Sequence, residues 1–300
     1  MLKRTVLIEN PCYLALRLNQ IILSYPDNLI PEKVVPIEDL GILICEHPQI
    51  TITNALIDAL LKNNTIIVHC DKSNYMPVGY NIPLQGNTLQ SERVKYQVNI
   101  SIPLKKNLWQ QTIKAKIKNQ RLLMEARNIP CDKMKKWEQE VLSGDTNNHE
   151  SRAAVFYWNK LFDKAGFLRS PDGAPPNHLL NYGYAILRSV AARSIVGAGL
   201  FPTLGIFHKN KYNAFCLADD IMEPYRPFVD QLVCEIMDSG SDITTLLRSS
   251  KIELLKVPVI DVTLNKTTHP LQLAMAKTAL SLVDCYSGKR KSMDYPVMQN

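Results

Sequence analysis

Three short stretches of the chain place polar side chains that can do chemistry within otherwise apolar surroundings. Glu150 stands in the first turn of an expected helix, where the helix dipole keeps a carboxylate ionised. His208 ends an apolar run, and Asp220 and Glu223 follow with a spacing that puts both carboxylates on one face if their turn is helical. One histidine and two or three carboxylates form a ligand set that suits Mg²⁺ or Mn²⁺. Such a site can drive phosphodiester chemistry.

Each of these groups also has a purely structural interpretation. Glu150 can simply complement the helix dipole, and a lone histidine such as His208 is more often structural than a ligand. Asp220 and Glu223 can cap the helix expected to begin at Pro224. No G-x-x-x-x-G-K-[ST], G-x-G-x-x-G or G-x-S-x-G motif occurs, so nucleotide hydrolysis, dinucleotide binding and serine hydrolase chemistry have no support.

The elements that must position these residues change in character along the chain. Residues 1–75 hold seven strand-like runs and one helix, over 55–61, that Thr53 or Asn54 can cap, which predicts an N-terminal β-sandwich-like domain. Residues 76–87 contain two Pro and two Gly and are interpreted as a linker. Residues 88–300 have helical periodicity, so we expect an α+β protein with a larger, mostly α-helical catalytic domain. Strands are expected at 4–9, 13–18, 20–25, 29–35, 41–45, 50–53 and 65–69, and helices at 91–100, 104–126, 131–142, 150–165, 179–198, 224–238 and 270–287.

The net charge of +7 is unevenly distributed. Residues 1–75 carry a balance of −2, whereas the remainder holds 29 basic and 20 acidic residues, a balance of +9. Within 105–136, Lys114, Lys118 and Arg121 fall on one helix face. This basic stripe is either a solvated surface or a series of contacts to the phosphates of a nucleic acid.

The cysteines and the hydropathy pattern indicate the compartment. Seven cysteines, with no C-x-x-C pair, fit buried thiols in a reducing cytoplasm better than a disulfide framework or a zinc site. The most apolar long stretch, 183–201, is interrupted by Arg188 and Arg193, so we expect no membrane span. We therefore expect a cytoplasmic protein.

The order and spacing of the candidate residues resemble the CRISPR-associated integrase, the metal-dependent nuclease subunit of the spacer-acquisition machinery. The resemblance rests on Glu150 with the aromatic pair Tyr157-Trp158, on His208, and on the run Asp220-Ile-Met-Glu223-Pro-Tyr-Arg-Pro227. It covers nearly the whole chain. Further segments look most like the branch found in type II systems, namely Ile8–Pro11, Pro36–Gly41, Thr51–Leu56, His69–Asp71, Leu108–Gln111 and Lys116–Gln120.

This resemblance implies an activity, a metal site and partners. Glu150, His208 and Glu223 would be the metal ligands, with Asp220 as an accessory acid, and His208 could instead be a general acid. The reaction would be a transesterification in which the 3′-OH of a short double-stranded prespacer DNA attacks a phosphodiester at a CRISPR repeat boundary. The chain would form homodimers that flank a dimer of a small ferredoxin-like adaptation protein, and in type II systems it would work with the effector nuclease.

The resemblance also gives roles to basic residues near the expected site. Arg152, Lys209, Lys211 and Arg226 would contact DNA phosphates, and the basic stripe on 105–136 would follow a duplex. The family often has a second histidine where this chain has Lys209. Two rival hypotheses remain: a stand-alone, structure-specific, metal-dependent DNA nuclease of repair, and a non-catalytic DNA-binding scaffold.

Overall fold

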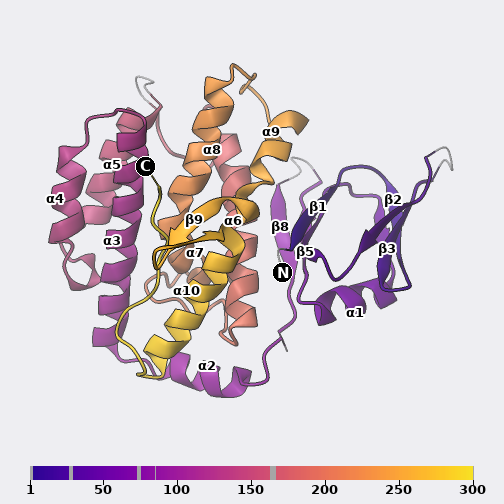
Figure 1. Ribbon diagram of the computed structural model, residues 1–300, viewed down its shortest axis with the longest axis horizontal. Coiled ribbons are helices and arrows are strands. Elements are labelled where there is room, and N and C mark those ends of the chain that lie inside the picture. Colours follow the sequence, from indigo (N-terminus) through magenta and orange to yellow (C-terminus); the bar gives the residue numbers. More distant parts are fainter. Residues whose placement is uncertain (1–2, 27–29, 73–75, 85, 163–166, 300) are drawn as a thin grey trace. The chain divides into compact units, whose positions relative to one another are not determined.

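The computed structural model describes residues 3–26, 30–72, 76–84, 86–162 and 167–299. These form two compact units, Met1–Thr88 and Leu89–Asn300 (Figure 1). The first unit is rich in strands and the second is mostly helical, so the expected order of a β domain followed by a larger α-helical domain is confirmed.

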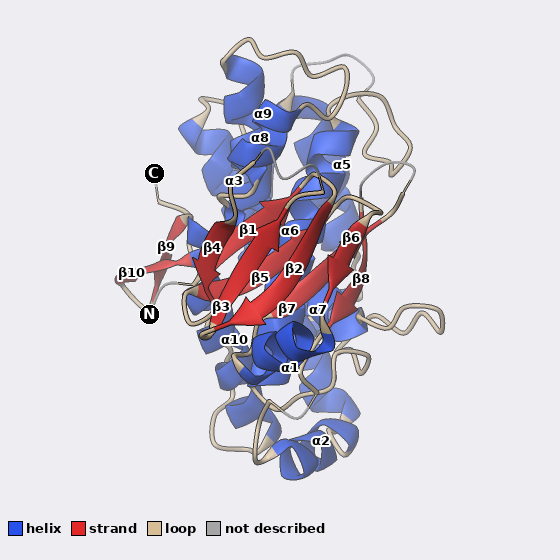
Figure 2. Cartoon of the chain, turned by 90° about the vertical axis from the view of Figure 1, so that its right-hand side faces the viewer, coloured by secondary structure: helices blue, strands red, loops and turns tan. Residues whose placement is uncertain are grey.

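The described residues of the first unit form two four-stranded sheets and one helix (Figure 2). One sheet has the order β1-β5-β7-β8, in which the first three strands are parallel and β8 is antiparallel to β7. The other sheet has the order β4-β3-β2-β6. Fully buried residues of both sheets and of the helix, such as Leu14, Leu43 and Leu56, share one hydrophobic core. The bounds are β1 Arg4–Ile8, β2 Cys12–Arg17, β3 Gln20–Ser24, β4 Lys33–Pro36, β5 Leu40–Cys45, β6 Ile50–Ile52, α1 Asn54–Lys62, β7 Ile66–Cys70 and β8 Pro77–Asn81.

All seven expected strands are present, and so is the helix. Thr53 caps α1, because its hydroxyl accepts a hydrogen bond from the Leu56 amide at 3.4 Å. Leu56 and Leu60 then point from one face of α1 into the core. The fourth expected strand, 29–35, is wrong in its first part, because residues 30–32 are not in a strand and β4 begins at Lys33, whereas Leu29 lies outside the described residues.

The linker expected at 76–87 is wrong in its first half. Pro77–Asn81 form β8, which pairs with β7 and completes the first sheet, and the compact unit extends to Thr88. Pro77 and Gly79 suggested a linker because both residues are uncommon within strands. They are tolerated here because β8 is an edge strand, which needs hydrogen bonds on one side only.

The second unit is built around two long helices, α3 and α6. Fully buried residues extend along both, including Ile113 and Ile117 of α3 and Leu187 of α6. Helix α3 contacts α4, α5 and α8, whereas α6 contacts α7 to α10. The bounds are α2 Gln90–Val98, α3 Ile102–Ala126, α4 Asp132–Glu140, η1 Ser143–Asp145, α5 His149–Leu161, α6 Asn177–Gly197, α7 Cys216–Met222, η2 Glu223–Tyr225, α8 Arg226–Asp238, α9 Arg248–Leu254, η3 Val257–Val259, β9 Asp261–Leu264, β10 Thr267–Pro270 and α10 Leu271–Tyr286.

The seven helices expected in this unit are present, with two qualifications. The end of the fourth, at Ala165, lies outside the described residues. Before the sixth, the short helix α7 and the 3₁₀ turn η2 precede α8, so the helical path begins at Cys216 instead of Pro224. No helix in the described part of the chain is both long and apolar enough to cross a membrane.

Candidate active site

Glu223 is a buried carboxylate whose two oxygens both face cationic groups. It stands at the start of η2 and is 5% exposed. Its Oε2 lies 2.6 Å from Lys116 Nζ, and its Oε1 accepts a hydrogen bond from Arg226 Nε at 2.8 Å. Burial alone would raise the pKa of Glu223, but the charges of Arg226 and Lys116 outweigh burial and lower this pKa to about 2. The carboxylate therefore remains ionised at neutral pH.

Glu150 approaches the same lysine from another helix. It lies in the first turn of α5, where the Asp145 carboxylate accepts hydrogen bonds from the amides of His149 at 2.9 Å and Glu150 at 3.0 Å. Its Oε1 lies 2.8 Å from Lys116 Nζ. The ammonium group of Lys116, whose side chain is only 11% exposed, thus sits between two carboxylates that come from different elements.

His208 is oriented by Asp220, which is completely buried. The Asp220 carboxylate lies 2.6 Å from His208 Nδ1 and also accepts hydrogen bonds from the amides of Ile206, Phe207 and His208. A Cβ at Gly205 would meet Asp220 Oδ2 at 2.8 Å, so the close approach of this loop requires glycine. The hydrogen bond with Asp220 raises the pKa of His208 and leaves Nε2 as the free ring nitrogen.

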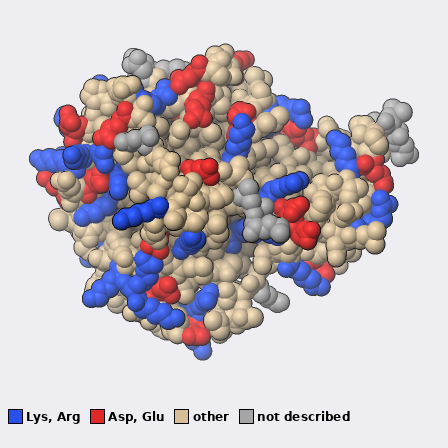
Figure 3. Space-filling view, viewed as in Figure 1, with Lys and Arg blue, Asp and Glu red and all other residues tan. Residues whose placement is uncertain are grey.

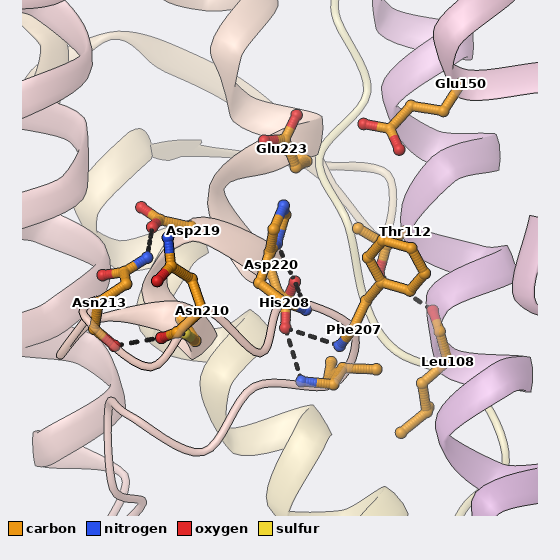
Figure 4. Close-up of polar contacts among 12 residues, drawn as sticks. Leu108, Thr112, Glu150, Phe207, His208, Asn210, Asn213, Asp219, Asp220 and Glu223 are labelled. Atoms are coloured by element: carbon orange, nitrogen blue, oxygen red, sulfur yellow. Dashed lines mark hydrogen bonds and ion pairs between the residues drawn. The ribbon is translucent and has the colours of Figure 1, made fainter.

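Glu150, His208 and Glu223 converge on one space, although they come from α5, a loop and η2 (Figure 4). Two carboxylates and one imidazole fit Mg²⁺ or Mn²⁺ in donor chemistry. Among the described residues, however, no group of three or more His, Cys, Asp or Glu side chains is assembled closely enough to hold a metal ion. A cation is nevertheless already held there, because Lys116 Nζ is within 2.8 Å of both acids. The residues therefore fit a divalent ion that replaces the ammonium group.

Comparison with known proteins decides the family. A family model described as CRISPR associated protein Cas1 matches residues 5–244. The CRISPR-associated endonuclease Cas1 of Neisseria meningitidis serogroup C (strain 8013) is 35% identical over 255 residues, which are 84% of this chain and 82% of that protein.

This chain belongs to the Cas1 family.

Solved structures agree with this assignment at the level of the fold. A casposase bound to an integration product has a TM-score of 0.78 at 16% identity, with 97% of this chain and 92% of that chain covered. A chain of a Cas6-RT-Cas1–Cas2 complex has a TM-score of 0.74 at 19% identity, with 96% of this chain and 35% of that chain covered. The Cas1 family consists of CRISPR-associated endonucleases, so the chain is an enzyme of the nuclease class. Nucleases of this family are in general metal-dependent.

Lys116 is the residue of this Cas1 site that the residue types alone did not reveal. Its position in the sequence did carry a signal, because Ile113, Ile117 and Gln120 place it beside the buried face of α3. A lysine that enters a buried face needs anionic partners. Glu150 and Glu223 are those partners, and the pair of ionic contacts could have been sought from the sequence.

The expected DNA-binding residues divide into two groups. Arg152, Lys209 and Lys211 are exposed, and Lys114 and Lys118 are partly exposed without a hydrogen-bond or ion-pair partner in the described part of the chain. Arg226 and Arg121 differ, because each is engaged within the protein. Arg226 binds Glu223, and Arg121 binds Glu138 at 3.0 Å and Glu125 at 2.7 Å, so these guanidinium groups position acids of the fold.

Proposed function

We propose that this chain is a CRISPR adaptation integrase, which joins the 3′-OH of a short prespacer DNA to a phosphodiester at a repeat boundary. The observation that carries the proposal is the cation position between Glu150 and Glu223, which Lys116 Nζ fills. The imidazole of His208, held through Nδ1 by Asp220, points toward the side chain of Glu223 (Figure 4). The casposase of similar fold, which was solved with an integration product, supports strand transfer as the reaction. The prespacer 3′ end, the repeat DNA and a metal ion would meet at this position.

Glu150, Glu223 and the Nε2 atom of His208 would hold Mg²⁺ or Mn²⁺. When bound, such an ion lowers the pKa of a hydroxyl nucleophile and stabilises negative charge on phosphate and on a departing 3′ oxygen. Sites of this kind gain most from ligands that are fixed before the substrate binds.

The side chains of the protein supply that fixed arrangement. Asp220 holds the imidazole of His208 through Nδ1 and anchors the loop backbone with the same carboxylate. Arg226 keeps Glu223 ionised and in place through Oε1. The ammonium group of Lys116, which lies against Glu150 and Glu223, would be available to a non-bridging phosphate oxygen when a divalent ion takes over these carboxylates.

We further propose the assembly that the resemblance implies. The chain would form homodimers that flank a dimer of the small ferredoxin-like adaptation protein, and the Cas6-RT-Cas1–Cas2 complex of similar fold supports such a partnership. The segments noted above favour the type II branch, in which the effector nuclease would also contact this machinery. The reaction would take place in the cytoplasm, a reducing compartment that suits a chain with seven cysteines and no C-x-x-C pair.

A strand-transfer assay tests the proposed reaction. The protein, with its adaptation partner, is incubated with Mn²⁺, a 3′-OH prespacer and supercoiled plasmid carrying a repeat array. We expect covalent prespacer–plasmid products at the repeat boundary, and none with a 3′-dideoxy prespacer. Cleavage of the plasmid that requires neither the prespacer nor the repeat would instead support a stand-alone repair nuclease.

The non-catalytic scaffold makes a different prediction. It predicts that Glu150→Gln and Glu223→Gln leave every activity unchanged, whereas charge reversal at Lys114 and Lys118 abolishes DNA binding. The integrase proposal predicts loss of strand transfer in both glutamine variants, with DNA binding retained.

A further inference from the structure

Phe207 presents an aromatic ring to solvent directly beside the catalytic histidine. The residue is 46% exposed, although it lies in an apolar run that ends at His208. Its ring stacks on Trp109 of α3, with the ring centroids 4.3 Å apart and the planes inclined by 2°. Trp109 is 1% exposed. Because the buried indole covers one face of the phenyl ring, the exposed area of Phe207 belongs to its other face and edge.

The ring is held rigidly. The amide of Phe207 donates to Asp220 Oδ2 at 3.0 Å, and the amides on either side of it donate to the same buried carboxylate. The ring also meets the imidazole of His208 edge-on, with centroids 5.7 Å apart (Figure 4). One carboxylate therefore fixes the imidazole of His208 and the backbone at residue 207, and the backbone position does not depend on the side chain that residue 207 carries.

The exposed face of Phe207 suits a flat, uncharged group, and the basic residues nearby suit a polyanion. Together they indicate an aromatic group that is part of a polyanion. Lys209 and Lys211 follow within four residues, and both are exposed. A nucleobase of DNA offers such a face, and stacking of one base on an aromatic side chain contributes about 1–3 kcal/mol. Bases within a duplex have both faces covered by their neighbours, so the ligand must be unpaired or terminal.

We propose that Phe207 is a stacking platform for the base of the 3′-terminal nucleotide of the DNA, the nucleotide that carries the reacting hydroxyl. This inference rests on the proposed function, since it assigns a positioning contact to the attacking strand. A base stacked on Phe207 would fix its sugar beside His208. The contribution is to positioning and affinity, not to bond making.

Binding measurements with abasic DNA test the platform. The affinity of the metal-free protein is measured by fluorescence anisotropy for two DNAs with single-stranded 3′ ends, identical except that one lacks the terminal base. For the unmodified protein we expect the abasic DNA to bind about tenfold more weakly. Phe207→Ala should bind both DNAs equally and weakly, whereas Phe207→Trp should restore the difference.

A matched control is available in the same loop. Phe201 is 37% exposed, its backbone amide is bound by Gln97, and Phe201→Ala should leave the tenfold difference intact. The inference is overturned if the unmodified protein binds both DNAs equally, or if the difference persists in Phe207→Ala. The strand-transfer assay on the unmodified protein is a separate readout, so failure of the integrase proposal and failure of the platform are distinguishable.

Discussion

At the scale of single residues, the site depends on buried charges that compensate one another. Glu223 is ionised although it is buried, because Lys116 and Arg226 each engage one of its oxygens. Asp220 is buried as well, and its carboxylate is satisfied by three backbone amides and one imidazole. Removal of one partner leaves the other charge buried and uncompensated, which lowers the stability of the fold, so substitutions at these residues should have large effects.

Removal of Lys116 should strengthen metal binding. In Lys116→Met the divalent ion no longer competes with an ammonium group for Glu150 and Glu223, so we expect the Kd for Mn²⁺ to fall about tenfold, equivalent to roughly 1.4 kcal/mol. Isothermal titration calorimetry measures this directly. Lys114→Met, on the same helix but without a carboxylate partner in the described part of the chain, should not change the Kd. An unchanged or higher Kd in Lys116→Met would show that the ammonium group does not occupy the metal position.

Asp230 should make the stability depend on pH. Burial raises its pKa to about 6, against hydrogen bonds from Tyr184 and Tyr157 that lower it. An acid whose pKa is raised on folding stabilises the fold fully below its unfolded pKa, near 3.8, and loses this contribution as the pH rises through 6. Because part of this contribution is already lost at pH 4, the protein should lose about 2 kcal/mol from pH 4 to pH 7 relative to Asp230→Asn. Urea unfolding at both pH values measures the difference, and a constant difference would contradict the raised pKa.

At the scale of elements, helix α3 connects the parts that carry the site. It contributes Lys116, and one turn later Asn119, whose buried amide donates to the carbonyl oxygens of Pro224 at 2.7 Å and Pro296 at 3.0 Å. The Asn119 side-chain oxygen also accepts from the amide of Met298 at 3.1 Å. One side chain thus ties the turn that carries Glu223 and the segment near the C-terminal end to the central helix.

Loss of this connection should cost stability. Asn119→Ala leaves buried carbonyl and amide groups without partners, and we expect the free energy of unfolding to fall by about 2–4 kcal/mol. Urea unfolding gives the value, with Lys118→Ala, one residue earlier and partly exposed, expected to change it by less than about 0.5 kcal/mol. Equal effects of the two substitutions would argue against the role assigned to Asn119.

The sequence predicted most elements but not the ones with the least local signal. The seven strands and seven long helices were readable because their apolar residues repeat with a clear period. Helix α7, with seven residues followed at once by Glu223-Pro224, is too short for such a period, and its residues are buried on nearly all sides. Strand β8 was missed because pairing with β7, a tertiary contact, outweighed the weak strand propensity of its Pro and Gly.

The candidate site shows the same division. Glu150, His208, Asp220 and Glu223 could be named as candidates from their residue types, but each also had a structural interpretation, and only the resemblance to a family selected the set. The structure directs Glu150, His208 and Glu223 toward one space, with Asp220 behind the imidazole of His208. A need for anionic partners could be expected from the place of Lys116 on α3, but that the partners are Glu150 and Glu223 depends on which elements lie beside this helix. The Glu223–Arg226 pair is local, because the two residues are three positions apart along the chain.

At the scale of the whole molecule, the positive charge is concentrated in the larger unit. Basic and acidic side chains are intermixed over the face formed by α3 and α4 (Figure 3). Several of the basic groups are neutralised there, as Arg121 is by Glu125 and Glu138. Net charge alone is therefore a poor guide to DNA contacts, and unpaired lysines are the better candidates.

The stripe on α3 should contribute to DNA affinity through its unpaired members only. Lys114→Gln combined with Lys118→Gln should weaken duplex binding and lower the slope of log K against log salt concentration by about two. Arg121→Gln should leave the slope unchanged, since its charge is already neutralised within the protein. Filter binding at several salt concentrations gives the slopes, and equal slopes for all variants would remove the stripe from the DNA interface.

The central claim is that Glu150, His208 and Glu223 form one metal site that performs strand transfer. Its most direct test measures Mn²⁺ affinity and strand-transfer rate on the same preparations of Glu150→Gln, His208→Ala and Glu223→Gln. The exposed Glu140→Gln serves as control. We predict that each of the three variants binds Mn²⁺ at least about tenfold more weakly and transfers strands roughly a hundredfold more slowly, while the control matches the unmodified protein. Full strand transfer or unchanged Mn²⁺ affinity in His208→Ala would contradict this account.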